Sequence, residues 1–128
     1  MKRYTKQITV SPQDLDALQH VNNVRYLEWV QEISREHWSE LTRPEWDALY
    51  FWVVRSHHIE YRRGAVAGDE LLLTTFVPEV TGPMSRRVVE ICLAGSGEMV
   101  ARCETQWCLI DSATKRPSRI PGPIRDCF

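Results

Sequence analysis

The spacing of hydrophobic and polar positions predicts a strand, a long helix and then a run of strands. Between residues 4 and 10 the side chains alternate with a period of two, which is typical of a strand. Residues 24–41 carry apolar side chains at roughly helical spacing, which predicts a helix of about five turns. The apolar positions that we assign to the buried face of this helix are Val24, Leu27, Val30, Ile33, Trp38 and Leu41. Residues 46–50 favour a further short helical turn.

The second half of the chain is rich in β-branched and aromatic residues, which are typical of strands. Turn signals divide it into predicted strands at residues 51–65, 70–80, 84–94 and 98–110. Strands this close in sequence usually pair with their neighbours, so we expect an antiparallel meander that the first strand also joins. The prolines of residues 111–128 predict an irregular tail on the surface. The fold class is therefore α+β, with one helix against an antiparallel sheet, in a single domain of residues 1–128.

Composition and charge exclude several classes of partner. The net charge of −1 gives no global basic field, so we expect no nucleic-acid partner. No apolar run approaches the ~20 residues of a membrane span, and the first residues do not resemble a signal peptide. The 4 cysteines form no CxxC pair, which favours free thiols in a reducing cytoplasm and predicts no metal site.

A cluster of polar residues lies directly before the predicted long helix. Asp14, Asp16, His20, Asn22 and Asn23 fall within ten residues. Either asparagine is suited to cap the helix by accepting a bond from a free backbone N–H. Carboxylate and imidazole groups gathered at a helix start suit acid–base chemistry, although a loop carboxylate can also simply bond local backbone. We assign Asp14 to the structure of the turn.

The segment DLDALQHVNNVRYLEW, residues 14–29, resembles the signature of hotdog-fold thioesterases. The likeness is to the acyl-ACP and 4-hydroxybenzoyl-CoA thioesterase branch, whose pattern is approximately D-x-D-x-x-x-H-V-N-N-x-x-Y. Residues 58–64 (HIEYRRG), 68–71 and 115–121 (KRPSRIP) resemble it further. The resemblance implies a hotdog fold, in which a curved antiparallel sheet wraps a long central helix. It also implies a homodimer with sheets joined edge to edge and active sites at the interface, or a tetramer built as a dimer of dimers.

The resemblance also implies roles for individual residues. Asp16 falls on the catalytic aspartate, as general base or nucleophile. His20 falls on the histidine of the acyl-ACP branch, as a hydrogen-bonding or acid–base partner. Asn22 or Asn23 would position the thioester carbonyl. The sequence departs from the plant acyl-ACP thioesterases at two positions. Leu18 stands where they have an asparagine, and Gly64 stands where they have a glutamate.

Basic side chains further along the chain are candidates to bind the phosphates of coenzyme A or phosphopantetheine. We assign this substrate-binding role to Arg62, Arg63 and Arg87. The alternative is that they lie on solvated strand faces, which carry such residues routinely.

The leading hypothesis for function is an acyl-CoA or acyl-ACP thioesterase of fatty acid metabolism, which hydrolyses a thioester to an acid and a thiol. It requires no cofactor, because the coenzyme A or phosphopantetheine thioester is itself the substrate. The alternatives are a hotdog hydratase or dehydratase, and a non-catalytic acyl-binding module.

Overall fold

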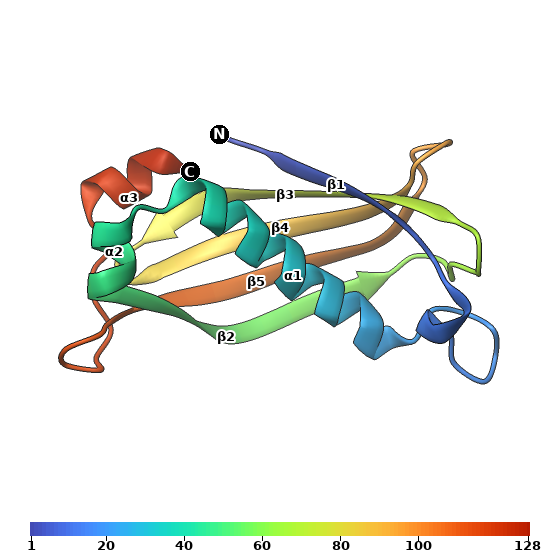
Figure 1. Ribbon diagram of the computed structural model, residues 1–128, viewed down its shortest axis with the longest axis horizontal. Helices are drawn as coiled ribbons and strands as arrows, with labels where there is room; N and C mark the ends of the chain where they lie inside the picture. The colour runs from blue at the N-terminus through green and yellow to red at the C-terminus, as the bar shows by residue number, and fades with distance from the viewer.

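The computed structural model describes residues 1–128, with a helix lying across one face of a five-stranded sheet (Figure 1). The strands are β1 (Tyr4–Thr9), β2 (Tyr50–Tyr61), β3 (Glu70–Thr81), β4 (Met84–Leu93) and β5 (Met99–Asp111). Every pairing is antiparallel and the order in space is β1-β3-β4-β5-β2. The predicted α+β class and hotdog arrangement are confirmed, and β1 joins the sheet as expected.

The central helix α1 (Asn23–Leu41) begins where the sequence places it. Asn22 caps it, because the side-chain Oδ1 accepts a hydrogen bond of 2.9 Å from the N–H of Val24. Tyr26, Val30 and Ile33 follow one side of the helix and are buried against the sheet. The prediction that Val24 is buried was wrong: it is 63% exposed. It lies two residues from Tyr26, which places it on the opposite side of a helix with about 3.6 residues per turn.

The predicted meander was wrong in one pairing, because β2 pairs with β5 at the edge of the sheet and does not pair with β3. The connection from β2 to β3 instead crosses the end of the sheet (Figure 1). Hydrogen bonds hold it there: the Ala65 carbonyl accepts from Val21 N–H at 2.9 Å, and the Asp69 carbonyl accepts from Val10 N–H at 2.9 Å. This connection lies directly beside the polar turn that precedes α1.

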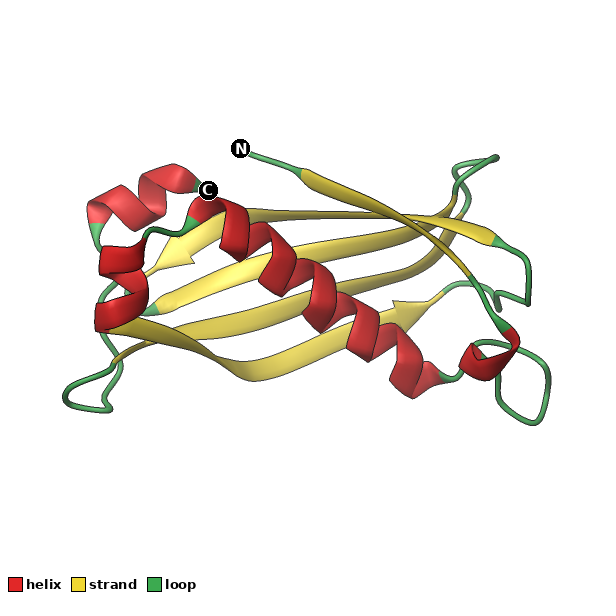
Figure 2. Ribbon diagram, in the orientation of Figure 1, coloured by secondary structure: helices red, strands yellow, loops and turns green.

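The C-terminal segment was predicted to be an irregular surface tail, and that prediction was wrong. It contains a short helix, α3 (Gly122–Cys127), which lies beside α2 (Pro44–Leu49) in Figure 2. Ile120 and Ile124 are buried and pack with Leu109 of β5. The prolines start α3, since proline suits the first helical turn, and Ile124 is its buried apolar residue.

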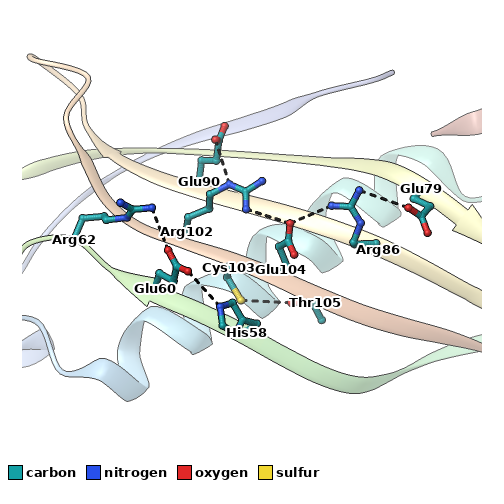
Figure 3. Close-up of polar contacts among 10 residues, drawn as sticks. All are labelled: His58, Glu60, Arg62, Glu79, Arg86, Glu90, Arg102, Cys103, Glu104 and Thr105. Atoms are coloured by element: carbon teal, nitrogen blue, oxygen red, sulfur yellow. Dashed lines mark hydrogen bonds and ion pairs between the residues drawn. The ribbon is translucent and has the colours of Figure 1, made fainter.

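The two faces of the sheet differ in chemistry. The face under α1 carries the main apolar core, whereas the opposite face carries a ladder of charged side chains on β4 and β5 (Figure 3). Arg86 pairs with Glu104 at 3.1 Å, and Glu104 also pairs with Arg102 at 3.2 Å. None of the helices is long and apolar enough to cross a bilayer. All 4 cysteines are free thiols, two of them buried and two half-buried.

Candidate active site

The polar turn before α1 is a tight hairpin closed by backbone hydrogen bonds. Leu15 and Val21 form an antiparallel bridge, and the Asp16 N–H donates to the His20 carbonyl at 2.8 Å. The Gln19 N–H donates to the Asp16 carbonyl at 3.1 Å, and Gln19 itself adopts a left-handed φ of 64°. Asp16 and His20 therefore lie opposite each other across the hairpin, with the exposed Leu18 at its tip.

The Asp16 carboxylate has one oxygen held and one oxygen available. Its Oδ1 accepts hydrogen bonds from the Leu18 N–H at 2.8 Å and from the His20 N–H at 3.4 Å. Its Oδ2 has no protein partner. A half-buried carboxylate fixed through one oxygen presents the other in a defined direction, which suits activation of a water molecule or direct attack on a carbonyl.

The His20 imidazole packs on Gly64 of the connection between β2 and β3. A Cβ atom on Gly64 would lie 2.6 Å from His20 Cδ2 and 3.1 Å from His20 Cγ. The ring makes no hydrogen bond, so His20 contacts Asp16 only through the backbone. Gly64, which stands where the plant enzymes carry a glutamate, is therefore the residue that leaves room for the ring. Sequence patterns gave no signal for this contact because the two residues lie in separate loops.

Gly64→Ala is expected to displace the His20 ring without unfolding the protein, since Gly64 is exposed and its φ is not left-handed. If His20 assists the reaction, kcat should fall about tenfold or more, in keeping with a misplaced acid–base partner. Steady-state kinetics beside the control Gly95→Ala, where an added Cβ meets nothing within 4 Å, measures this. Unchanged kinetics in Gly64→Ala would remove His20 from the mechanism.

Asp14 fixes the base of the turn, as its structural assignment predicted. Its Oδ2 accepts hydrogen bonds from the Ser11 N–H at 2.9 Å and the Ser11 Oγ at 3.1 Å, and its Oδ1 accepts from Arg25 Nε at 3.0 Å. Burial alone would raise the pKa of Asp14, but these bonds to Ser11 and Arg25 outweigh it and hold the pKa below its ordinary value. Asp14 is therefore ionised and ties η1 (Pro12–Asp14) to α1.

Asp14→Asn is expected to lower the free energy of unfolding at pH 7 by about 1.5–3 kcal/mol, the range for hydrogen bonds to a charged group. Because the folded pKa of Asp14 is lowered, its contribution is present above its unfolded pKa of about 3.9 and is lost as the pH falls through the folded value. Urea unfolding at pH 7 and pH 3 should show that the difference in free energy of unfolding between the wild type and Asp14→Asn is smaller at pH 3. Asp126→Asn, at an exposed position, is the control. An equal loss of unfolding free energy at both pH values would contradict this role for the Asp14 charge.

The other predicted site residues divide between the neighbourhood of the turn and the interior. Asn22 caps α1, while Asn23 is the exposed first residue of the helix, and its backbone N–H has no partner. Arg62 and Arg63 follow β2 beside Gly64, and both are exposed, in ion pairs with Glu60 at 3.1 Å and Glu98 at 2.6 Å. Figure 3 shows the pair of Arg62 with Glu60.

Arg87 lies elsewhere, in the interior below α1. It is 4% exposed, and its Nη1 donates to His37 Nδ1 at 2.9 Å and to Thr75 Oγ1 at 3.0 Å. The sequence offered Arg87 as a phosphate ligand or as a residue of a solvated strand face, because the pattern of β4 does not show which of its faces is covered. Arg86 faces the charged ladder (Figure 3), so its neighbour Arg87 faces the helix.

A cavity of about 500 Å³ lies beside the C-terminal half of α1, and sequence reasoning did not locate it. Its walls include Gln31, Ser34 and Trp38 of α1, Trp52 of β2, Arg87 of β4 and Trp107 of β5. This volume is within the usual range of pockets that bind small molecules, roughly 300–1,000 Å³. No residue of the Asp16 turn lines it, so within one chain the turn and the cavity lie at opposite ends of α1.

No group of three or more His, Cys, Asp or Glu side chains is placed to share a metal ion. The turn instead presents one oriented carboxylate, one imidazole and an unpaired backbone N–H at the start of a helix. This set suits the attack of water on an activated carbonyl.

Together, a helix wrapped by an antiparallel sheet and an aspartate–histidine turn at the helix start define a hotdog enzyme of the thioesterase kind. The family model of the thioesterase-like superfamily matches residues 10–128, and the chain belongs to that superfamily. The sequence-based identification and the enzyme class, a thioester hydrolase, are thereby confirmed.

Individual relatives agree with this assignment. The long-chain acyl-CoA thioesterase FadM of Escherichia coli is 31% identical over 122 residues, which cover 94% of this chain and 92% of the relative. The crystal structure of the probable thioesterase YbaW of Escherichia coli superposes with a TM-score of 0.86 at 31% identity, over 96% of this chain and 94% of that one. A 12:0-ACP thioesterase of Umbellularia californica shares the fold, with a TM-score of 0.87 at 20% identity, over 98% of this chain and 50% of that one.

Proposed function

We propose that this protein hydrolyses acyl-CoA thioesters and that Asp16 is the residue that starts the reaction. The observation that carries the proposal is the Asp16 carboxylate, held by the Leu18 N–H through Oδ1 with Oδ2 left free. Acting as general base, Oδ2 takes a proton from water as the water oxygen attacks the thioester carbonyl, and the C–S bond then breaks to expel the thiolate. Acting as nucleophile, Oδ2 attacks that carbonyl itself and expels the thiolate, which leaves a mixed anhydride on Asp16 that water hydrolyses. Either route releases a carboxylic acid and a thiol, and uses protein groups and water alone.

The start of α1 is suited to stabilise the negative charge that develops on the carbonyl oxygen. The N–H of Asn23 has no partner, because the Asn22 side chain caps Val24 instead. The positive end of the helix dipole adds to the effect of this donor. In this proposal Asn22 and Asn23 contribute as the start of α1, and the His20 ring, which packs on Gly64, is suited to give a proton to the leaving thiolate.

Arg62 and Arg63 are suited to bind the phosphates of the thiol carrier. They lie on the same connection as Gly64, which packs on His20, and their ion pairs with Glu60 and Glu98 are exposed. Exposed ion pairs contribute little stability, about 0–1 kcal/mol, so either arginine can exchange its carboxylate for a phosphate. Coenzyme A and the phosphopantetheine of a carrier protein present the same chemistry to this pair of side chains. The predicted cytoplasmic location stays a prediction, which the four free thiols favour.

Thiol release from acyl-CoA esters of increasing chain length, and from an aromatic ester, tests the proposed activity. We expect hydrolysis of at least one class. Tight binding of acyl esters without any release would instead indicate an acyl-binding module, and would overturn the proposal.

The active unit that we propose is a homodimer joined through β2. This strand ends the sheet order and pairs only with β5, so its outer edge of 12 residues is open. When two such edges pair antiparallel, the first residues of one β2 lie near the last residues of the other. Tyr50 and Trp52, at the start of β2, line the cavity, whereas the end of β2 leads to Gly64 beside His20. The cavity of one copy thus approaches Asp16 of the partner subunit. In the predicted tetramer, two such dimers would associate through their charged outer faces.

Mixing two inactive variants tests whether an active site is shared between subunits. Asp16→Asn removes the reactive carboxylate, and Gln31→Trp fills the cavity. Randomly mixed dimers contain about one quarter of the wild-type number of intact sites if each site takes Asp16 from one copy and the cavity from the other. We expect that fraction of activity to return after the two variants are refolded together. No recovery in a mixture shown by light scattering to be dimeric would place each site within one chain.

A further inference from the structure

A row of polar side chains crosses the buried face of the sheet below α1. Thr75 of β3 bonds to Arg87 of β4, Arg87 lies opposite Thr105 of β5, and the Thr105 hydroxyl lies 2.8 Å from His57 Nδ1 of β2. Thr75 and Thr105 are both fully buried. On either side of this row the core is apolar, with one cluster around Ile33 and another around Leu109. Core positions normally carry apolar side chains, and polar exceptions to this rule are concentrated at functional sites.

Arg87 is the charged member of this row, and it has no counter-ion. No carboxylate lies within 4.0 Å of its guanidinium. The ion pairs of the protein are all formed by arginine, lysine or histidine side chains that are more exposed than Arg87. Burial lowers the pKa of Arg87 to about 10, which still leaves the guanidinium charged at neutral pH. A buried cation without an anion is costly to the folded state.

The protein groups that Arg87 contacts do not neutralise it. Burial, together with the charges of Arg87 and Lys2, lowers the pKa of His37 to about 4, so the imidazole is neutral at pH 7 and accepts the Arg87 hydrogen bond. Both protein bonds use Nη1, and the remaining N–H groups of the guanidinium donate to no protein atom. Arg87 therefore keeps both its charge and most of its donors.

These donors belong to a side chain that lines the cavity. The indole Nε1 of Trp107, which lines the same cavity, is also buried without a hydrogen-bond partner. The other charged side chains of the lining are those of Arg35 and Asp47, both exposed, and Asp47 already accepts a hydrogen bond from the Thr42 hydroxyl at 2.7 Å. The buried part of the lining thus offers a cation with free N–H donors, and no carboxylate side chain of matching charge.

We propose that the cavity receives an acyl group whose end remote from the thioester carries a carboxylate, and that Arg87 pairs with that carboxylate. A carboxylate matches the planar guanidinium in geometry as well as in charge. Trp38 and Trp52 provide apolar walls for the methylene chain between the two ends. This inference rests on the proposed thioester hydrolysis in the proposed homodimer, in which the cavity of one copy approaches Asp16 of the partner subunit. It names a substrate class for that reaction: ω-carboxyacyl thioesters.

Hydrolysis of suberoyl-CoA and octanoyl-CoA, which differ only at the remote end, measures the preference directly. We expect the wild-type protein to favour suberoyl-CoA in kcat/KM. Arg87→Met should lower the ratio of the two kcat/KM values by about ten- to hundredfold, the range for hydrogen bonds to a charged group. Arg86→Met is the matched control, because Arg86 is the adjacent residue on the opposite face of β4 and pairs with Glu104. An equal ratio in all three proteins would overturn the inference while leaving the hydrolase proposal intact.

Calorimetric binding to the wild-type protein gives a second measurement that needs neither turnover nor a stable Arg87→Met variant. Monomethyl suberate retains one carboxylate, whereas dimethyl suberate retains none. We expect the first to bind at least tenfold more tightly, and Arg87→Lys to keep part of this difference. Such a preference without hydrolysis of either CoA ester would support the carboxylate subsite and contradict the proposed function. Equal binding of the two esters would overturn the subsite.

Discussion

Asp16→Asn is expected to reduce kcat/KM for acyl-CoA hydrolysis by about 10²- to 10⁴-fold, the usual contribution of a positioned acid–base group. The amide oxygen can still accept the Leu18 N–H bond that orients the side chain, so the hairpin should keep its shape. What is lost is the charge and basicity of the free Oδ2. Initial rates of thiol release, measured for both proteins at saturating and limiting substrate, separate an effect on kcat from one on KM.

The control for Asp16→Asn is the midpoint of thermal unfolding, which should be almost unchanged because the replaced group is half-buried and keeps its backbone bond. Activity within threefold of the wild type in a folded Asp16→Asn protein would contradict the assignment. If His20→Ala then abolished thiol release, the imidazole would be the primary base.

Ile33→Ala is expected to lower the free energy of unfolding by about 2–5 kcal/mol, the range for truncation of a fully buried isoleucine. Ile33 is 0% exposed and lies in the cluster that joins α1 to the sheet, where it packs among residues such as Val30 and Leu73. The alanine leaves a void that close-packed neighbours fill only in part. Urea unfolding followed by tryptophan fluorescence gives the change directly.

Val24→Ala is the matched control, because the helical pattern assigned Val24 and Ile33 to the same face. With Val24 63% exposed, its truncation should change the free energy of unfolding by no more than about 0.5 kcal/mol. Equal losses in the two variants would mean that the sheet covers Val24 as well, for instance through a partner subunit.

The sequence by itself determined the order of the elements as far as β5 and the position of the candidate catalytic turn. Alternation, helical spacing and turn residues are local properties, so they located β1, α1 and the later strands to within a few residues. The D-x-D-x-x-x-H-V-N-N pattern likewise kept Asp16, His20 and the cap Asn22 within one hairpin. These residues are neighbours in the chain, and local hydrogen bonds hold them together in the fold.

Only the tertiary structure decided the contacts between distant segments. Strand alternation treats the two faces of β4 alike, so it did not distinguish Arg87, which lies under α1, from Arg86, which lies on the charged ladder. It also did not place Gly64 under His20, or β2 beside β5, because those contacts join residues far apart in the chain. The hairpin of Asp16 follows from local sequence, whereas the cavity and its unpaired cation arise from how the helix packs across the sheet.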